Sequence, residues 1–454
     1  MKKNTQTSMR ELWVLSYPLI VTMAAHVIMQ FVDRMFLAWY SHEALAACVP
    51  AGVLAMTSGA LFMGLASYTS VFISQYYAKK KRASVTISLW QGIFLALLSW
   101  GILAALTPAG NGLIRLFHHG ADVTPLEITY FTILNLFGGV VIVNNALSGF
   151  FSGRGKTLVP MYVTLIGNAV NVVLDYVLIF GKLGFAPMGI AGAAWGTIFG
   201  AVAMLLIYGG LIFGLPRTRR SFRITQLAGF YKPVFSKLVR FGVPNGFGFM
   251  MDFLSFTLFT FMVGNIDVIS LQASNVVMSM QPLVFTVILG LGGGIQILVS
   301  KYQGLKRPDL SVQVVKNACK LGFSYALFIG LTFFFAAPLL VGLFIAPSSP
   351  NAVEITLKTY PLMKLISGFV LFDAAYLIFG EAIRGAGDTK YYMHVMLGCA
   401  WGLLVPGTWV LVYQLHASVL AVWSWLTFYA ALTAVFMVVR FCRGKWKSIE
   451  ITKA

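Results

Sequence analysis

Long apolar segments recur along this chain, and their length limits the folds that are open to it. Twelve such segments are separated by short polar joints, and about 20 predominantly apolar residues are enough for a helix to cross the hydrocarbon core of a bilayer. Hydrophobic residues make up 58% of the chain and charged residues only 10%, whereas soluble domains average about 25% charged residues. The sequence therefore predicts an all-α polytopic membrane protein with twelve transmembrane helices.

The expected spans fall into two sets of six, on either side of a basic connection. We expect an N-terminal six-helix lobe over 1–214, a cytoplasmic linker over 215–240, a C-terminal six-helix lobe over 241–440 and a cytoplasmic tail over 441–454. The predicted spans are 12–39, 45–77, 87–108, 126–150, 158–181, 188–214, 241–265, 270–302, 318–346, 360–384, 390–414 and 417–440.

The two halves have similar sequences. The identities at an offset of 226 residues pair Pro18 with Pro244, Gly64 with Gly290, Leu65 with Leu291, Ser74 with Ser300 and Tyr76 with Tyr302. A second match aligns residues 153–157 with 385–389. Because each half has an even number of spans, the two bundles have the same orientation in the membrane, which is the plan of transporters built from parallel repeats.

The positive charges lie in alternate joints. All but five of the 33 Lys and Arg fall on one side of the expected membrane, and the exceptions are Arg34, Arg115, Lys182, Lys358 and Lys364. This asymmetry predicts a multi-pass protein of the bacterial inner membrane with both termini in the cytoplasm. It also accounts for the net charge of +19 without a nucleic-acid partner.

Five of the fourteen acidic residues lie inside expected spans: Asp33, Asp175, Asp252, Asp373 and Glu381. A charged side chain costs at least ~2.5 kcal/mol at the bilayer centre, so these groups must face protein, water or an ion. Glu381 is three residues before Arg384, and we expect a local ion pair there.

The fifth span carries an oxygen-rich face. Asn168, Asn171 and Asp175 are spaced by three and four residues, which places them on one side of a helix. Asp33 of the first span would add a second carboxylate to this group. Such oxygens suit Na⁺ or a proton, although polar residues in membranes also serve simply to hold helices together.

The C-terminal half carries different chemistry. Asp252 and Asp373 have no acidic counterparts at the repeat offsets. Flexible thioethers suit a cavity for varied apolar cations as well as they suit packing. The candidate substrate-lining residues are Met251, Met278, Met280 and Gln281.

The sequence has no Walker motif, no HExxH and no paired-cysteine metal site. We therefore expect neither an enzyme nor a cofactor, and we expect a monomer that contacts the lipid bilayer.

The chain resembles the MATE family, the multidrug and toxic compound extrusion transporters. The resemblance rests on the 31–33 motif of the first span, Asn171 and Asp175 in the fifth, and Asp373 with the 383–389 segment in and after the tenth. It implies two six-helix lobes around a central cavity and an antiporter driven by Na⁺ or H⁺ that exports organic cations.

The resemblance also implies roles for particular residues. Asp33, Asn171 and Asp175 are similar to the family's cation or proton site, like that of the DinF-type branch, and Thr197 would add a hydroxyl. Asp252 and Asp373 match the acidic positions of the NorM-type branch, although that branch commonly has Glu at the first of them. It also tends to have Asn where this chain has Asp175.

The function expected from the sequence is efflux of small amphipathic, mostly cationic organic compounds in exchange for H⁺ or Na⁺. One alternative is a lipid-linked oligosaccharide flippase of related architecture, which we would expect to have cationic residues in its cavity. A less favoured alternative is an integral-membrane enzyme, which would need a polar catalytic cluster near an interface.

Overall fold

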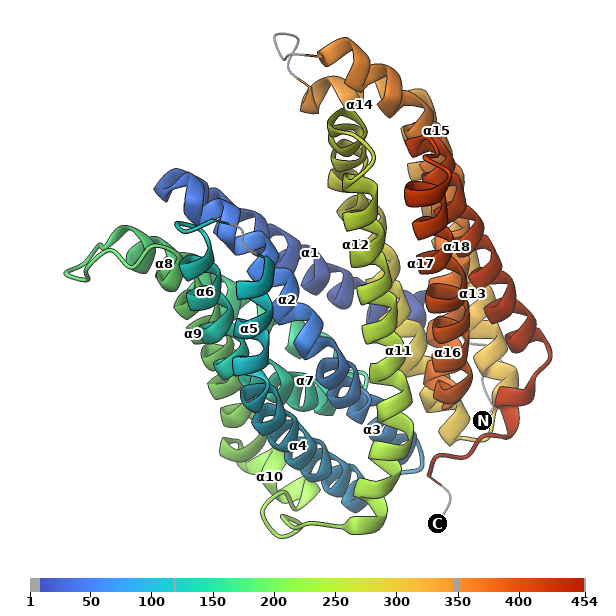
Figure 1. The fold of residues 1–454 in the computed structure, drawn as a ribbon. Coiled ribbons are helices and arrows are strands. Elements are labelled where there is room, and N and C mark those ends of the chain that lie inside the picture. Colours follow the sequence, from blue (N-terminus) through green and yellow to red (C-terminus); the bar gives the residue numbers. More distant parts are fainter. Residues whose placement is uncertain (1–8, 118–119, 346–350, 453–454) are drawn as a thin grey trace. The chain divides into compact units, whose positions relative to one another are not determined.

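The computed structural model describes residues 9–117, 120–345 and 351–452, which are mostly helical and contain no strand (Figure 1). The N-terminal half contains α1 (Met9–Tyr40), α2 (His42–Ser67), α3 (Thr69–Ala78), α4 (Arg82–Ala105), α5 (Thr107–Phe117), α6 (Thr124–Phe137), α7 (Gly139–Ser152), α8 (Leu158–Phe180), α9 (Ile190–Gly209) and α10 (Pro216–Phe222). The C-terminal half contains α11 (Lys232–Gly264), α12 (Val268–Gly304), α13 (Pro308–Phe335), α14 (Ala337–Phe344), α15 (Ala352–Ala386), α16 (Thr389–Met396), α17 (Val405–Trp409) and α18 (Val419–Cys442).

The described residues contain 12 helical segments long and apolar enough to cross a membrane, which confirms the predicted number. Several spans consist of two helices in succession, such as α2 with α3 and α6 with α7. Several spans begin earlier than predicted, most of all those that start at Lys232, Pro308 and Ala352. The first turns of these three carry Lys, Asp and Glu side chains, so a criterion based on hydropathy alone excludes them although their backbone is helical.

The helices pack into two compact units. The N-terminal unit contains residues 21–247 and 451–452 of the described chain, and the C-terminal unit contains residues 9–20 and 248–450. The division therefore falls inside α1 and inside α11, close to Pro18 and Pro244. The lobes predicted at 1–214 and 241–440 follow the order of the spans along the chain, and they remain a proposal about which parts move together.

In the N-terminal unit, the first half of α11 packs closely on α2. The amide nitrogen of Asn245, a fully buried residue, donates a hydrogen bond of 2.7 Å to the Gly64 carbonyl oxygen. One residue later, a Cβ added to Gly246 would lie 2.2 Å from the Leu61 carbonyl oxygen. The two helices therefore approach each other backbone to backbone, as small residues allow in membrane proteins.

The C-terminal unit repeats this contact with the start of α1 and α12. A Cβ added to Gly290 would lie 2.5 Å from the Ile20 Cα, and one added to Gly294 would lie 2.0 Å from the Ser16 hydroxyl oxygen. At the repeat offset, Ile20 corresponds to Gly246 and Gly290 to Gly64. The glycine that allows the close approach is therefore on α11 in the N-terminal unit and on α12 in the C-terminal unit. These helices are not equivalent in the repeat, but the two backbones approach closely in both contacts.

A second pair of equivalent contacts involves the matched segments at the ends of α7 and α15. A Cβ added to Gly153 would lie 2.5 Å from the Ser70 carbonyl oxygen, and one added to Gly385 would lie 2.6 Å from the Gln296 carbonyl oxygen. Ser70 and Gln296 are themselves 226 residues apart. The predicted arrangement of two pseudo-symmetric bundles is thus visible in the packing of corresponding residues.

Candidate functional site

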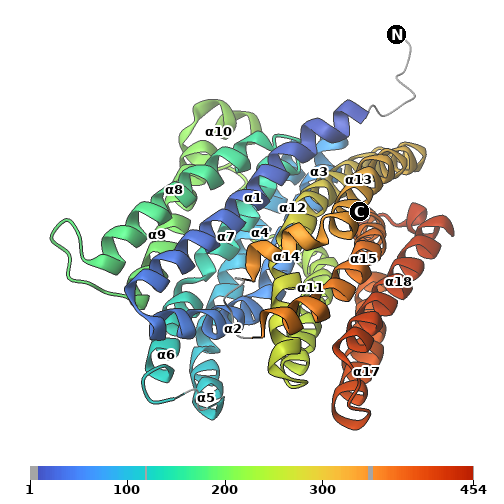
Figure 2. The same cartoon turned by 90° about the horizontal axis from the view of Figure 1, so that it is seen from above.

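A stripe of glycines on α9 brings this helix against α8, and Figures 1 and 2 both show the two helices side by side. Gly192, Gly196 and Gly200 recur every four residues, so they share one helix face. A Cβ added to Gly196 would lie only 1.8 Å from the Asp175 Oδ1, and one added to Gly200 would lie 2.9 Å from the Asn171 Cβ. Because these glycines have no side chains, α9 leaves the space that Asp175 and Asn171 occupy.

The carboxyl groups of Asp33 on α1 and Asp175 on α8 are close enough to interact with each other, and the Asn171 side chain interacts with Asp175. All three side chains are buried, Asp175 completely. The structure therefore brings together three of the residues that the sequence had singled out, from helices about 140 residues apart in the chain.

These buried groups lack hydrogen-bond partners among the described residues. Both carboxyl oxygens of Asp175, the Oδ1 of Asp33 and the side-chain amide atoms of Asn171 and Asn168 make no hydrogen bond with the described residues. Two ionised carboxylates only accept hydrogen bonds, so neither can satisfy the other, and their charges repel. A proton or a cation between them would remove both costs, and the all-oxygen donor set fits either one.

Arg34 and Thr197 are two further residues that lie next to members of this cluster in the chain. Arg34 follows Asp33 in the chain but is exposed, and neither Asp33 nor Asp175 forms an ion pair with a Lys or Arg within the described ranges. The Thr197 hydroxyl, one residue beyond Gly196, donates to the Ala193 carbonyl oxygen of its own helix at 3.1 Å. The structure gives Thr197 no bond to the carboxyl pair, and its implied role stays a prediction.

The C-terminal unit holds Asp252 in a cluster of tyrosines. The Tyr376 hydroxyl donates to its Oδ2 at 3.0 Å and the Tyr429 hydroxyl donates to its Oδ1 at 3.3 Å. The Tyr376 hydroxyl also lies 3.2 Å from that of Tyr392. These groups come from α11, α15, α18 and α16, so they join four helices around one carboxylate.

Asp373 lies on α15, one turn before Tyr376, and is buried. Its Oδ2 has no hydrogen-bond partner among the described residues, and its charge is close enough to interact with that of Asp252. Unlike the pair in the N-terminal unit, Asp252 has hydroxyl donors that stabilise its ionised form. The two units thus hold carboxylates in different surroundings.

The predicted ion pair in the tenth span is confirmed. Arg384 donates to Glu381 at 2.7 Å, and both side chains are largely buried. The guanidinium group of Arg384 also lies over the ring of Tyr392, 5.0 Å from its centre. Glu381 is therefore neutralised locally.

The candidate substrate-lining residues lie mostly in packed surroundings. Met251 and Met280 belong to the hydrophobic core of the C-terminal unit, and Met278 packs against that core. The side-chain amide nitrogen of Gln281 is buried without a hydrogen-bond partner among the described residues. A role in binding substrate remains a proposal for these four side chains.

Several contributors to these clusters were not identified from the sequence. The glycine stripe of α9 has a visible signal, small residues repeated every four positions in an apolar span. The tyrosines have a weaker one. Tyr376 follows Asp373 by three residues, but Tyr392 follows Asp388, an acid outside the cluster that pairs with Arg440. Tyr392 and Tyr429 come from other helices, and no local pattern connects them to Asp252.

The tyrosine cluster leads to a measurable prediction for Tyr376→Phe. The change removes a buried donor from Asp252 and leaves the ring in place, which we expect to destabilise the purified protein by about 1–3 kcal/mol. Tyr391→Phe is the matched control, since its hydroxyl donates to the Phe436 carbonyl oxygen on the exposed surface. Thermal unfolding in detergent compares them, and equal melting temperatures for the two variants would contradict the prediction.

The fold and its buried carboxylates define a multi-pass membrane protein made of two duplicated helical bundles, a class in which intramembrane acids mark ion paths. The sequence profile of the MatE family matches residues 18–177 and 244–410, one stretch in each half. Since these stretches cover more than half of the chain, the protein belongs to the MatE family.

Individual relatives agree with this assignment. A protein of Thermotoga maritima named "Probable multidrug resistance protein NorM" is 24% identical over 446 residues, covering 96% of this chain and 93% of that protein. A MOP superfamily transporter from Pyrococcus furiosus has the same fold, with a TM-score of 0.86 at 18% identity over 97% of each chain. An outward-facing multidrug resistance MATE family transporter matches with a TM-score of 0.85 at 18% identity over 98% of this chain and 97% of that one.

Proposed function

We propose that the protein is a multidrug efflux antiporter that exports small amphipathic, mostly cationic organic compounds in exchange for H⁺ or Na⁺. The observation that carries the proposal is the pair formed by Asp33 and Asp175, two buried carboxyls that interact with each other and form no ion pair with a Lys or Arg of the described residues. The names of the NorM relatives support the substrate class. The charge placement supports an inner-membrane location with both termini in the cytoplasm, and we propose that the protein works as a monomer without a cofactor.

Binding of the coupling ion to this pair would change the conformation of the protein. With both carboxyls ionised, repulsion favours a larger separation between α1 and α8, whereas one bound proton or Na⁺ favours a closer approach. An ion shifts a conformational equilibrium only if it binds one conformation better than the other. We propose that this difference changes the packing of α1 and α8 within the N-terminal unit and releases substrate outward.

The tight contact between α8 and α9 favours a switch between distinct packing arrangements over a gradual movement. Gly196 leaves no room for Asp175 to move toward α9, so when ion loss leaves both carboxyls ionised, their repulsion is relieved by movement along the helix axis or by displacement of α1. Packed interfaces of this kind tend to have alternative arrangements and resist continuous deformation. Asp252 and Asp373 would form a second ion-binding position in the C-terminal unit.

A transport assay with separated gradients tests the proposal. Purified protein is reconstituted into proteoliposomes, and movement of a fluorescent organic cation is recorded under a pH gradient alone and then under a Na⁺ gradient alone. We expect substrate to move against the direction of one ion gradient and to stop when that gradient is dissipated. Movement that is the same with and without both gradients would reject ion coupling, and protection of a lipid-linked oligosaccharide from external reagents would favour the flippase.

A further inference from the structure

The linker between the halves is fastened along α4 by hydrogen bonds to its backbone. The Thr86 hydroxyl donates to the Phe222 carbonyl oxygen at 2.5 Å, and the Trp90 indole nitrogen donates to the Ile224 carbonyl oxygen at 2.9 Å. The side-chain amide of Gln91 holds two further backbone groups of the linker, as a donor at 2.8 Å and as an acceptor at 3.1 Å. A flexible tether would be enough to join two bundles, whereas this linker is held in one conformation along α4.

The part of the linker that is hydrogen-bonded to α4 carries an exposed arginine. Phe222 and Ile224 are buried, whereas Arg223 between them is exposed. Arg223 has a φ of +54°, in the left-handed region that non-glycine residues adopt infrequently. This conformation ends α10, whose C-cap is Arg223.

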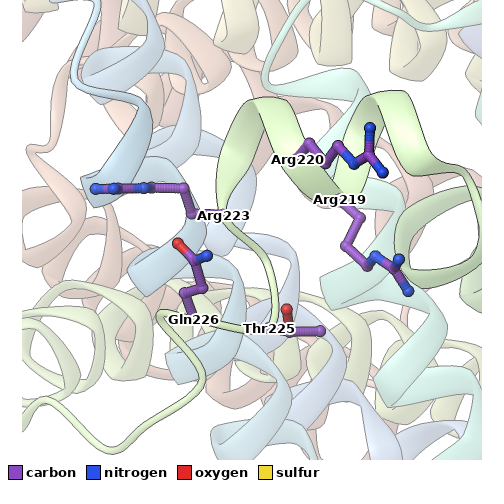
Figure 3. A pocket seen from close by; sticks show the side chains of 5 residues that line it. All are labelled: Arg219, Arg220, Arg223, Thr225 and Gln226. Atoms are coloured by element: carbon purple, nitrogen blue, oxygen red, sulfur yellow. The ribbon is translucent and has the colours of Figure 1, made fainter.

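Arg223 lines a pocket with a volume of about 380 Å³, together with Arg219, Arg220, Thr225 and Gln226. Figure 3 shows Arg219 and Arg220 extending to one side of the pocket and Arg223 to the other, with Thr225 and Gln226 between them. The hydroxyl and amide groups provide short polar contacts. The three long exposed side chains carry guanidinium groups that can pair with a phosphate through two hydrogen bonds each.

No carboxylate of this segment neutralises these arginines. The chain has no acidic residue between Asp175 and Asp252, and the five acids of the N-terminal unit lie elsewhere, in α1, α2, α6, α8 and the joint before α6. Several basic residues of the C-terminal unit, by contrast, are paired with acids. These pairs are Lys301 with Glu11 at 2.7 Å, Lys306 with Glu450 at 3.0 Å, Arg307 with Asp309 at 2.6 Å, Arg384 with Glu381 at 2.7 Å, and Arg440 with Asp388 at 2.7 Å.

The pocket lies where the sixth span leaves the membrane and the seventh enters it. Leu215, directly before α10, and Phe230 and Tyr231, directly before α11, are exposed. The Phe230 ring contacts Phe94 of the third span at 6.2 Å between ring centres. Exposed aromatic residues beside basic groups are typical of the level of the lipid headgroups. A ligand of the pocket would therefore reach it most directly from the membrane.

We propose that this pocket binds the phosphate of an anionic phospholipid headgroup. Arg219 and Arg220 would pair with the phosphodiester and Arg223 would add positive charge from the other side of the pocket. Thr225 and Gln226 would bind neighbouring oxygens, and the acyl chains would lie along the apolar surface beside Phe230. The positive-inside distribution by itself requires only basic charge on one side of the membrane. It does not require a linker backbone held against α4, a pocket, or a group of arginines with no acidic residue in the same segment.

The test measures lipid binding directly. The full chain is placed in nanodiscs of zwitterionic phosphatidylcholine, and a phosphatidylglycerol with a fluorescent acyl chain is titrated in at low ionic strength. We expect saturable binding, and roughly a hundredfold weaker binding for the triple variant Arg219→Gln, Arg220→Gln, Arg223→Gln, because each cation near an anionic headgroup strengthens binding about five-fold. The Arg→Lys triple should bind with intermediate affinity, since it keeps the charge and loses the paired hydrogen bonds.

The matched control removes the same charge from the same unit. Lys80, Lys81 and Lys156 are exposed and do not line the pocket, so Lys80→Gln, Lys81→Gln, Lys156→Gln should leave affinity within about threefold of wild type. Equal losses in the two glutamine variants would overturn the proposal, because the effect would then be one of overall charge. Displacement of the lipid by inorganic phosphate at similar concentration would overturn the lipid as occupant. Unchanged melting temperatures in pure phosphatidylcholine would show that every variant is folded.

Discussion

Replacing either Asp33 or Asp175 with Asn is expected to abolish gradient-driven transport while leaving the protein inserted and folded. Asn has nearly the same shape but does not take up or release a proton, and one neutral amide in place of a carboxyl removes the repulsion that makes ion binding necessary. If the pair supplies the coupling, ions no longer distinguish the two conformations of the N-terminal unit. We expect transport in proteoliposomes to fall at least a hundredfold, to the level of passive leak.

The control for these variants is Asp122→Asn, the same change at an exposed acid before α6. It should transport like the wild type, because it lies outside the buried pair. Binding of the fluorescent substrate without a gradient should persist in all three variants, which separates coupling from substrate recognition. Full gradient-driven activity in both Asp33→Asn and Asp175→Asn would show that the buried pair does not couple transport to an ion.

Gly196→Ala is expected to be more damaging than its small size suggests. The added methyl group would lie 1.8 Å from the Asp175 Oδ1, far inside van der Waals contact, so either the carboxyl or the whole of α9 must move. Forcing extra volume into a packed interior typically costs 1–3 kcal/mol. We expect a loss of about 2 kcal/mol in stability, measured by thermal unfolding, and transport at least tenfold below wild type.

Gly209→Ala provides a comparison on the same helix. A Cβ at Gly209 would meet no atom within 4 Å, and alanine favours a helix over glycine by up to about 1 kcal/mol. This variant should be as stable as the wild type or more so, with unchanged transport. If Gly196→Ala behaved in the same way, the close contact of α9 with Asp175 would not control the position of that carboxyl.

Local patterns in the sequence were sufficient for much of the architecture. Spans are recognisable because the membrane imposes a minimum apolar length on every crossing helix, and this requirement predicted all twelve. The same requirement makes Asp33, Asp175, Asp252 and Asp373 conspicuous, since ionisable groups are costly in that setting. Helix ends were less predictable, as at Lys232, because a helix can continue into water with polar residues.

What the sequence determined by itself is therefore the number of spans, their duplication and the identity of the buried acids, all of which follow from solvation by lipid. Tertiary structure decided which groups meet: Asp33 with Asp175, three tyrosines around Asp252, and the linker along α4. Those contacts join helices far apart in the chain, and apolar spans resemble one another too closely for hydropathy to select partners. The choice is made by small residues such as Gly196, whose missing side chains let particular helices approach.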